Sequence, residues 1–179
     1  MSEERKAAAV FCSASYEIDP KFNDAARAVV RILSRNGYGI VSGGTVKGTM
    51  GVLADEAVKA GAGHVGIIPR FMEEVVHPGL TEVIWTDLMS ARKDLMREKG
   101  HSLAIALPGG IGTMDELIET LTLAKLGRYH GRVFALNLDG FYDPLVALLD
   151  HFVQTGMLDA RSRALIAFPR TPEEFEAML

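Results

Sequence analysis

The sequence has a single cysteine, Cys12, among its 179 residues. One thiol cannot form an internal disulfide bond or supply the several sulfur ligands of a cysteine-rich zinc site, so both are excluded. Because Cys12 ends a short apolar run, we interpret it as a small buried side chain rather than a nucleophile.

Long apolar runs and basic blocks are also missing. No uncharged apolar stretch reaches the roughly 18–20 residues that span a bilayer, and the polar leader MSEERK lacks the apolar segment of a signal peptide. We therefore expect a cytoplasmic protein that does not interact with membranes. The formal net charge of −4 and the absence of basic blocks argue against nucleic-acid binding.

Length and composition predict one α/β domain over residues 1–179, since 48% of the residues are hydrophobic and 23% are charged. Apolar runs alternate with amphipathic segments, which predicts a doubly wound, largely parallel sheet with helices on both faces. The expected strands cover residues 7–12, 38–41, 65–68, 83–85, 103–107, 133–137 and 165–168. The expected helices cover residues 20 to about 36, 50–61, 87–99 and 142–152. A further helix follows the 107–116 loop and ends near residue 124, and a terminal helix begins at a cap formed by residues 171–174. Residues 70–80 are expected to be irregular.

The stretch LPGGIGTMDE, residues 107–116, connects an expected strand to an expected helix. Its glycines are Gly109, Gly110 and Gly112. They allow a sharp turn and a close approach of a ligand to the backbone. Unpaired N–H groups and the dipole at the helix start favour a phosphate there, and Thr113 adds a hydroxyl donor. Glu116 lies one turn into the helix, which indicates nucleotide chemistry, although an acidic residue at a helix start is also common for stability alone.

A second glycine-rich turn, SGGTVKGTMG at residues 42–51, follows another expected strand. Its glycine spacing is not GxGxxG, and it lacks the Lys-Ser/Thr pair of a phosphate loop, so ATP hydrolysis is poorly supported. We interpret Lys47 as a solvated residue at a helix start.

The pair Arg92-Lys93 lies in the first turns of the helix expected over residues 87–99. One interpretation is that both residues are surface charges, and the other is that at least one of them reaches inward towards a ligand. The position after a strand favours the other, because ligands of such sheets bind beyond the carboxyl ends of the strands. A guanidinium there suits phosphate or ribose oxygens. The Glu116 carboxylate could accept hydrogen bonds from sugar hydroxyls, orient a water molecule, or stabilise an oxocarbenium ion during N-glycosidic cleavage.

Three stretches resemble the signatures of the LOG family of cytokinin riboside 5′-monophosphate phosphoribohydrolases, also described as lysine decarboxylases. They are GGTVKGTMG at 43–51, ARK at 91–93 and PGGIGTMDE at 108–116. The stretches VGIIP, LTLAKLG and NLDGFYDPL extend the similarity over nearly the whole chain. The resemblance implies a Rossmann-like fold, a homodimer, and cofactor-free hydrolysis of a nucleoside 5′-monophosphate to a free base and ribose 5-phosphate. Several bacterial members accept AMP.

By this resemblance, Arg92 and Glu116 are the catalytic pair. The residues implied to bind substrate are Gly43, Gly44, Thr45, Lys93, Gly109, Gly110, Gly112, Thr113 and Thr122. The chain departs from the usual family pattern at Thr45, Thr49, Ser90-Ala91 and Asp115. These departures preserve the phosphate cradle and leave the preferred base, cytokinin-type or adenine, open.

Two other functions compete with hydrolysis. A non-catalytic nucleotide-binding module would keep the same phosphate cradle, and the presence of both Arg92 and Glu116 argues against it. Lysine decarboxylation through pyridoxal phosphate needs a Schiff-base lysine in a larger scaffold, and no lysine of this sequence is singled out for that role.

Overall fold

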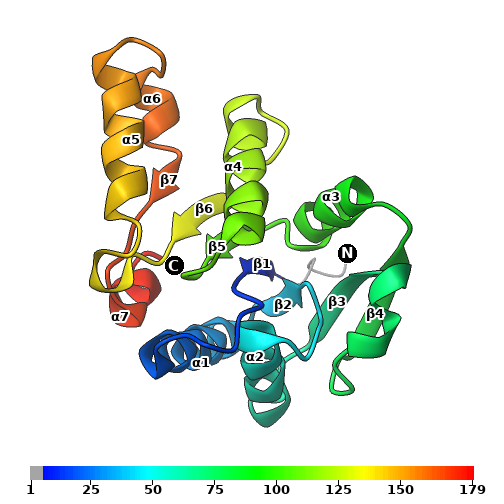
Figure 1. Ribbon diagram of the computed structural model, residues 1–179. Helices are drawn as coiled ribbons and strands as arrows, with labels where there is room; N and C mark the ends of the chain where they lie inside the picture. Colours follow the sequence, from blue (N-terminus) through cyan, green and yellow to red (C-terminus); the bar gives the residue numbers. More distant parts are fainter. Residues whose placement is uncertain (1–5) are drawn as a thin grey trace.

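A computed structural model describes residues 6–179, so all but Lys6 of the polar leader lies outside the described residues. The chain forms a seven-stranded sheet of order β4-β3-β2-β1-β5-β6-β7 (Figure 1). Every pairing between neighbouring strands is parallel. The strands are β1 (Ala7–Phe11), β2 (Gly39–Ser42), β3 (His64–Pro69), β4 (Glu82–Thr86), β5 (Leu103–Ala106), β6 (Arg132–Ala135) and β7 (Ile166–Ala167). The predicted parallel α/β sheet is confirmed.

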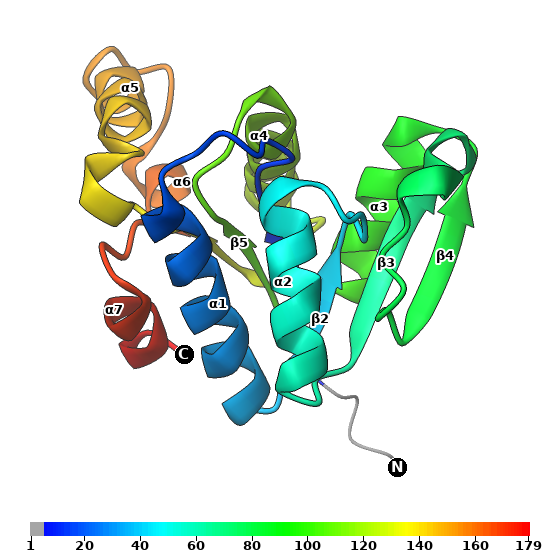
Figure 2. The same ribbon diagram turned by 60° about the horizontal axis from the view of Figure 1, so that its bottom comes forward.

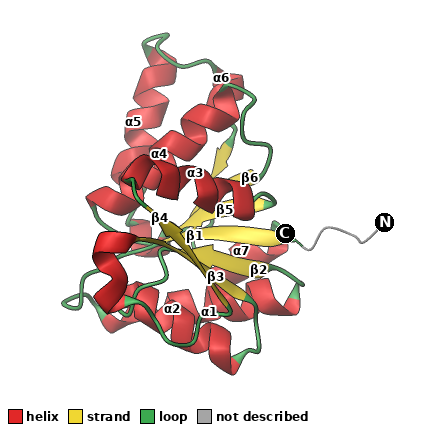
Figure 3. Cartoon of the chain, turned by 90° about the vertical axis from the view of Figure 1, so that its right-hand side faces the viewer, coloured by secondary structure: helices red, strands yellow, loops and turns green. Residues whose placement is uncertain are grey.

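Helices cover both faces of the sheet, as predicted (Figure 3). One face carries α1 (Pro20–Arg35), α2 (Gly48–Lys59) and α7 (Pro172–Ala177), and α1 and α2 run side by side (Figure 2). The other carries α3 (Met89–Lys99), α4 (Ile111–Lys125) and α5 (Asp143–Gln154), with the short α6 (Ala160–Arg163) beside α5. Within the described residues, no helix is both long and apolar enough to cross a membrane.

The core has two layers because side chains alternate along each strand. In β1, Ala8 and Val10 pack towards α1 and α2, whereas Ala9 and Phe11 pack towards α3 and α4. All four side chains are buried. A strand buried on both faces reads as an unbroken apolar run, which is why the sequence pattern located β1 correctly.

The chain reverses its direction across the sheet beside β1. From β1 it proceeds outward through β2, β3 and β4, and then crosses to β5, which pairs with the other edge of β1. Val10 lies opposite Ile105 and Phe11 opposite Ala106 in this pairing. The connections after β1 and β5 therefore diverge to opposite faces and leave a crevice at the carboxyl ends of the two strands, where such sheets bind ligands.

The segment after β3 is more regular than expected. Residues predicted to be irregular contain a 3-10 helix, η1 (Arg70–Val75). Val76 then forms an isolated bridge with Thr45, and the His77 N–H donates to the Gly44 carbonyl at 2.9 Å. This segment thus packs on the glycine-rich turn after β2. A second short 3-10 helix, η2 (Leu138–Gly140), lies between β6 and α5.

Candidate active site

A cavity of about 370 Å³ opens at the carboxyl ends of β1, β2 and β5. Its walls come from the loop after β1, the turn after β2, η1, and the first turns of α2, α3 and α4. The lining residues are Val10, Cys12, Ser13, Ala14, Ser15, Gly43, Met50, Met72, Met89, Arg92, Gly110, Gly112, Thr113 and Glu116. The cavity therefore lies at the point where the order of the strands reverses.

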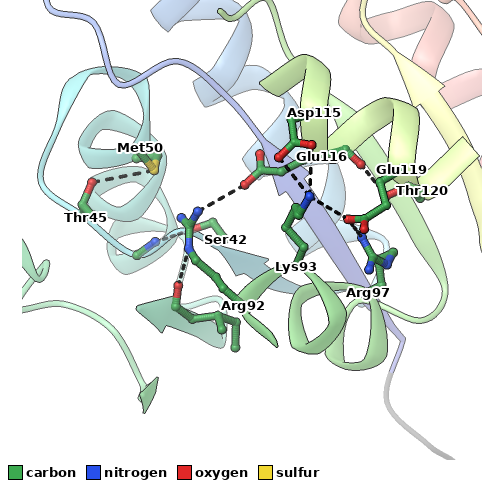
Figure 4. Close-up of polar contacts among 12 residues, drawn as sticks. Ser42, Thr45, Met50, Arg92, Lys93, Arg97, Asp115, Glu116, Glu119 and Thr120 are labelled. Carbon is green, nitrogen blue, oxygen red and sulfur yellow. Dashed lines mark hydrogen bonds and ion pairs between the residues drawn. The ribbon is translucent and has the colours of Figure 1, made fainter. Parts of the chain in front are cut away.

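The predicted pair Arg92 and Glu116 meets in this cavity, with Nη1 of Arg92 3.4 Å from Oε1 of Glu116 (Figure 4). Arg92 comes from the first turn of α3 and Glu116 from the second turn of α4. Both are buried, with 9% and 12% of their side-chain surfaces exposed. The Nε–H of Arg92 donates to the Ile67 carbonyl at 2.9 Å, which fixes the plane of the guanidinium. A buried guanidinium and a buried carboxylate thus face the same space.

Gly43 provides the room that Arg92 needs. A Cβ on Gly43 would lie far inside van der Waals contact with Nη2 of Arg92, and 2.8 Å from Sδ of Met50. The guanidinium therefore rests directly on the backbone of the glycine-rich turn after β2. This contact explains why a glycine stands at this position.

The acidity of Glu116 is strongly altered by its surroundings. Burial raises the pKa of Glu116 from 4.5 to about 7, and the Arg92 guanidinium partly opposes this shift. A carboxyl group with a pKa near neutrality can both hold and release a proton at physiological pH. The thiol of Cys12 lies nearby, and burial raises its pKa, so the thiol stays neutral. This agrees with its interpretation as a buried side chain.

The glycine-rich loop of residues 107–116 leads into the start of α4. Gly110 and Gly112 line the cavity, and a Cβ on either would meet no atom within 4 Å. Gly109 has a different role, because a Cβ there would collide with the side chain of Thr113, which is itself buried and lines the cavity. The loop therefore keeps open space directly over the first turn of α4.

The helices that start at the cavity lack side-chain caps. The capping residues Lys47 of α2, Leu88 of α3 and Gly110 of α4 make no side-chain hydrogen bond to their helices. By contrast, Asp19 caps α1, and Thr171 caps α7 as predicted, and neither residue lines the cavity. Uncapped N-termini leave N–H donors and partial positive charge at the cavity, which suits an anion.

Five of the predicted substrate-binding residues do not line the cavity: Gly44, Thr45, Lys93, Gly109 and Thr122. Gly44, at φ +67°, packs against Gly66, and Thr45 is fully buried beside Met50. Lys93 is held at 3.0 Å from Asp115, and Thr122 is exposed on α4. Substrate binding by these residues stays a prediction.

The apolar part of the cavity wall carries no signal in the sequence. Met50, Met72 and Met89 come from α2, η1 and α3. Methionine spacing carries no motif, so only the fold brings them together. Among residues 6–179, no group of three or more His, Cys, Asp or Glu side chains is placed to hold a metal ion.

Solved structures share this fold at low sequence identity. The molybdenum cofactor binding protein from Rippkaea orientalis aligns with a TM-score of 0.75 and 22% identity over 99% of this chain and 96% of that one. The molybdenum cofactor carrier protein from Chlamydomonas reinhardtii aligns with a TM-score of 0.71 and 18% identity over 98% and 96%. At these identities the likeness concerns the fold alone.

Sequence comparison gives closer relatives. A probable cytokinin riboside 5′-monophosphate phosphoribohydrolase, LOGL1, from Oryza sativa subsp. japonica is 36% identical over 167 residues, 92% of this chain and 74% of that protein. The cytokinin riboside 5′-monophosphate phosphoribohydrolase of Rhodococcoides fascians is 35% identical over 164 residues, 90% and 82% of the two chains. The family model described as "Possible lysine decarboxylase" matches residues 50–179. The chain therefore belongs to the LOG family.

Proposed function

We propose that the protein hydrolyses the N-glycosidic bond of a nucleoside 5′-monophosphate, either a cytokinin riboside monophosphate or AMP, to a free base and ribose 5-phosphate. The observation that carries this proposal is the buried pair of Arg92 and Glu116 in a cavity ringed by uncapped helix N-termini. The names of the relatives support the same reaction class.

The phosphate binds at the start of α4. The glycine loop Gly109, Gly110 and Gly112 offers backbone N–H groups, and Thr113 adds its hydroxyl. The turn of Gly43, Gly44 and Thr45 shapes the adjoining wall. Arg92 is permanently charged and donates to phosphate or ribose oxygens from the opposite side of the cavity.

Glu116 acts on the reacting carbon. Hydrolysis breaks the bond between C1′ and the base nitrogen, forms a bond from C1′ to a water oxygen, and transfers a proton to the departing base. Positive charge develops on the ribose as the base leaves, and an ionised carboxylate stabilises it. The same carboxylate, with a pKa near 7, can take the proton of the attacking water.

The direct test is product detection. Purified protein is incubated with AMP and with isopentenyladenosine monophosphate, and free base and ribose 5-phosphate are measured by chromatography. Release of base from either substrate supports the proposal, and the ratio of rates identifies the preferred base. Nucleotide binding without release from either substrate would overturn it in favour of a non-catalytic binding module.

A variant assigns the role of Glu116. Glu116→Gln removes the charge with little change in volume, so we expect base release to fall by about 10²-fold or more while AMP binding is retained. Glu56→Gln is a matched control, because Glu56 is also buried and pairs with an arginine, Nε of Arg31 at 2.6 Å, far from the cavity. Full activity of Glu116→Gln would exclude this residue from catalysis.

We also propose that the protein is a homodimer joined through α4. This helix exposes the side chains of Ile111 and Ile118, at 91% and 39%. Together with Met114 they border a shallow groove on the surface of a single chain. A second copy of the same helix is a self-complementary partner for such a stripe.

A further inference from the structure

A cluster of ion pairs connects α3 to α4 outside the cavity (Figure 4). Nη1 of Arg97 lies 2.7 Å from Oε2 of Glu119, and Nζ of Lys93 lies 3.1 Å from the same carboxylate. Lys93 also contacts Asp115 at 3.0 Å, and Arg97 contacts Asp94 on its own helix. Only 6% of the Arg97 side chain is exposed. A buried guanidinium with two carboxylate partners is costly to disrupt.

This cluster joins the same two helices as the Arg92–Glu116 pair. Arg92 precedes Lys93 on α3, and Asp115 precedes Glu116 on α4, so the two sets of contacts are adjacent. The direct contact between Arg92 and Glu116 is long, at 3.4 Å. The tighter contacts beside this pair tie α4 to α3.

We propose that Arg97 is a positioning residue for the reaction, which holds α4 against α3 through Glu119, about one turn from Glu116. This inference rests on the proposed function. Arg97 does not line the cavity and acts only through its neighbours.

The charges around Glu116 support this role. The ionisable groups around its carboxyl are Arg92, Lys93 and Arg97 on α3, Asp115 and Glu119 on α4, and Cys12 after β1. The three cations lower the pKa of Glu116, whereas burial and Asp115 raise it, and the Cys12 thiol is neutral. Loss of the Arg97 charge would leave Asp94 and Glu119 without their guanidinium and would raise the pKa of Glu116 further.

The test is the pH dependence of kcat/KM for base release between pH 5.5 and 9.5. Because the reaction uses the Glu116 carboxylate, the rate falls as the pH drops below its pKa. In Arg97→Gln we expect the acidic limb of the profile to move to higher pH by a fraction of a pH unit, because Arg97 is the weakest of the three cations that lower the pKa of Glu116. The rate should recover at high pH. Arg97→Lys keeps the positive charge, so the acidic limb of its pH profile should lie near that of the wild type.

A second variant predicts the opposite shift. Glu119→Gln removes the carboxylate that pairs with Lys93 and Arg97 and leaves their charges less neutralised, so we expect the acidic limb to move to lower pH. Arg27→Gln is the matched control, because Arg27 also pairs with an aspartate three residues earlier on its helix, at 2.7 Å, and lies far from the cavity. Its profile should equal that of the wild type.

The outcomes are distinguishable. A rate that falls by the same factor at every pH in both variants, with unmoved limbs, would indicate a purely structural cluster and overturn the inference. Unchanged profiles would overturn it as well. If Arg97→Gln does not fold, the direction of the shift in Glu119→Gln decides. Absence of base release by the wild-type protein would instead contradict the proposed function itself.

Discussion

Arg92 keeps its place because Gly43 has no side chain. The guanidinium is held between the Ile67 carbonyl, the Glu116 carboxylate and the backbone of Gly43. Two of these contacts are polar and directional, whereas the third is a simple requirement for space. The geometry of the site is therefore sensitive to a single added methyl group.

We expect Gly43→Ala to lower kcat/KM for base release by about 10²-fold, because the new methyl group displaces the Arg92 guanidinium from its position beside Glu116. Steady-state kinetics and circular dichroism check this. Gly63→Ala is the control, since a Cβ there meets no atom within 4 Å. Wild-type kinetics in Gly43→Ala would show that the position of Arg92 does not limit the rate.

Individual residues of the site were predictable where a motif carried them. The loop motif and the ARK triplet placed Glu116 and Arg92 on helix starts after strands, and the fold brings both to one cavity. Arg97 and Met72 carry no such signal. Arg97 becomes notable only once α3 lies against α4, and Met72 only once η1 folds over the turn after β2.

At the scale of elements, buried strands and capped helices were predictable. β5 was expected at 103–107 and spans Leu103–Ala106. Helix α1 begins after Asp19, whose carboxylate accepts a hydrogen bond from the Lys21 N–H. The 3-10 helix η1 was not expected, because six residues without apolar periodicity give no helical signal. Its structure depends on tertiary contacts with the turn after β2.

The same turn is supported from inside the sheet by a buried histidine. Nε2 of His64 on β3 lies 2.7 Å from Oγ of Ser42 on β2, and this oxygen also accepts the N–H of Gly44 at 3.1 Å. Nδ1 of His64 has no hydrogen-bond partner among the described residues. Burial lowers the pKa of His64 from 6.5 to about 4.

This histidine makes the stability of the fold depend on pH. In the unfolded chain His64 becomes protonated below about pH 6.5, whereas in the folded chain it stays neutral until the pH falls to about 4. The stability is therefore complete above pH 6.5 and decreases as the pH falls, by up to about 3 kcal/mol. In His64→Gln, whose amide can still bond Ser42, this part of the decrease should disappear.

Urea unfolding at pH 7 and pH 4.5 measures the difference. The free energy of unfolding should fall more steeply in the wild type than in His64→Gln, because all other titrating groups are common to both. Equal decreases would mean that His64 is protonated readily in the folded protein.

At the scale of the whole molecule, the proposed dimer depends on the exposed stripe of α4. We expect the protein to sediment at twice its chain mass of 19.4 kDa, and Ile118→Glu to sediment as a monomer, since a buried charge opposes association. Val58→Glu is the control, because Val58 is 54% exposed on α2, on the opposite face of the sheet. A wild-type protein of 19.4 kDa would contradict the proposal.

The central place of β1 also has a consequence for the nascent chain. Strands β2, β3 and β4 emerge from the ribosome before β5, and they cover only one edge of β1. Until β5 has been made, the other edge presents free N–H and C=O groups, which pair readily with strands of other chains. At that moment Arg92 has already been synthesised and Glu116 has not. The growing chain is therefore most open to wrong pairing during the interval in which its site is half complete.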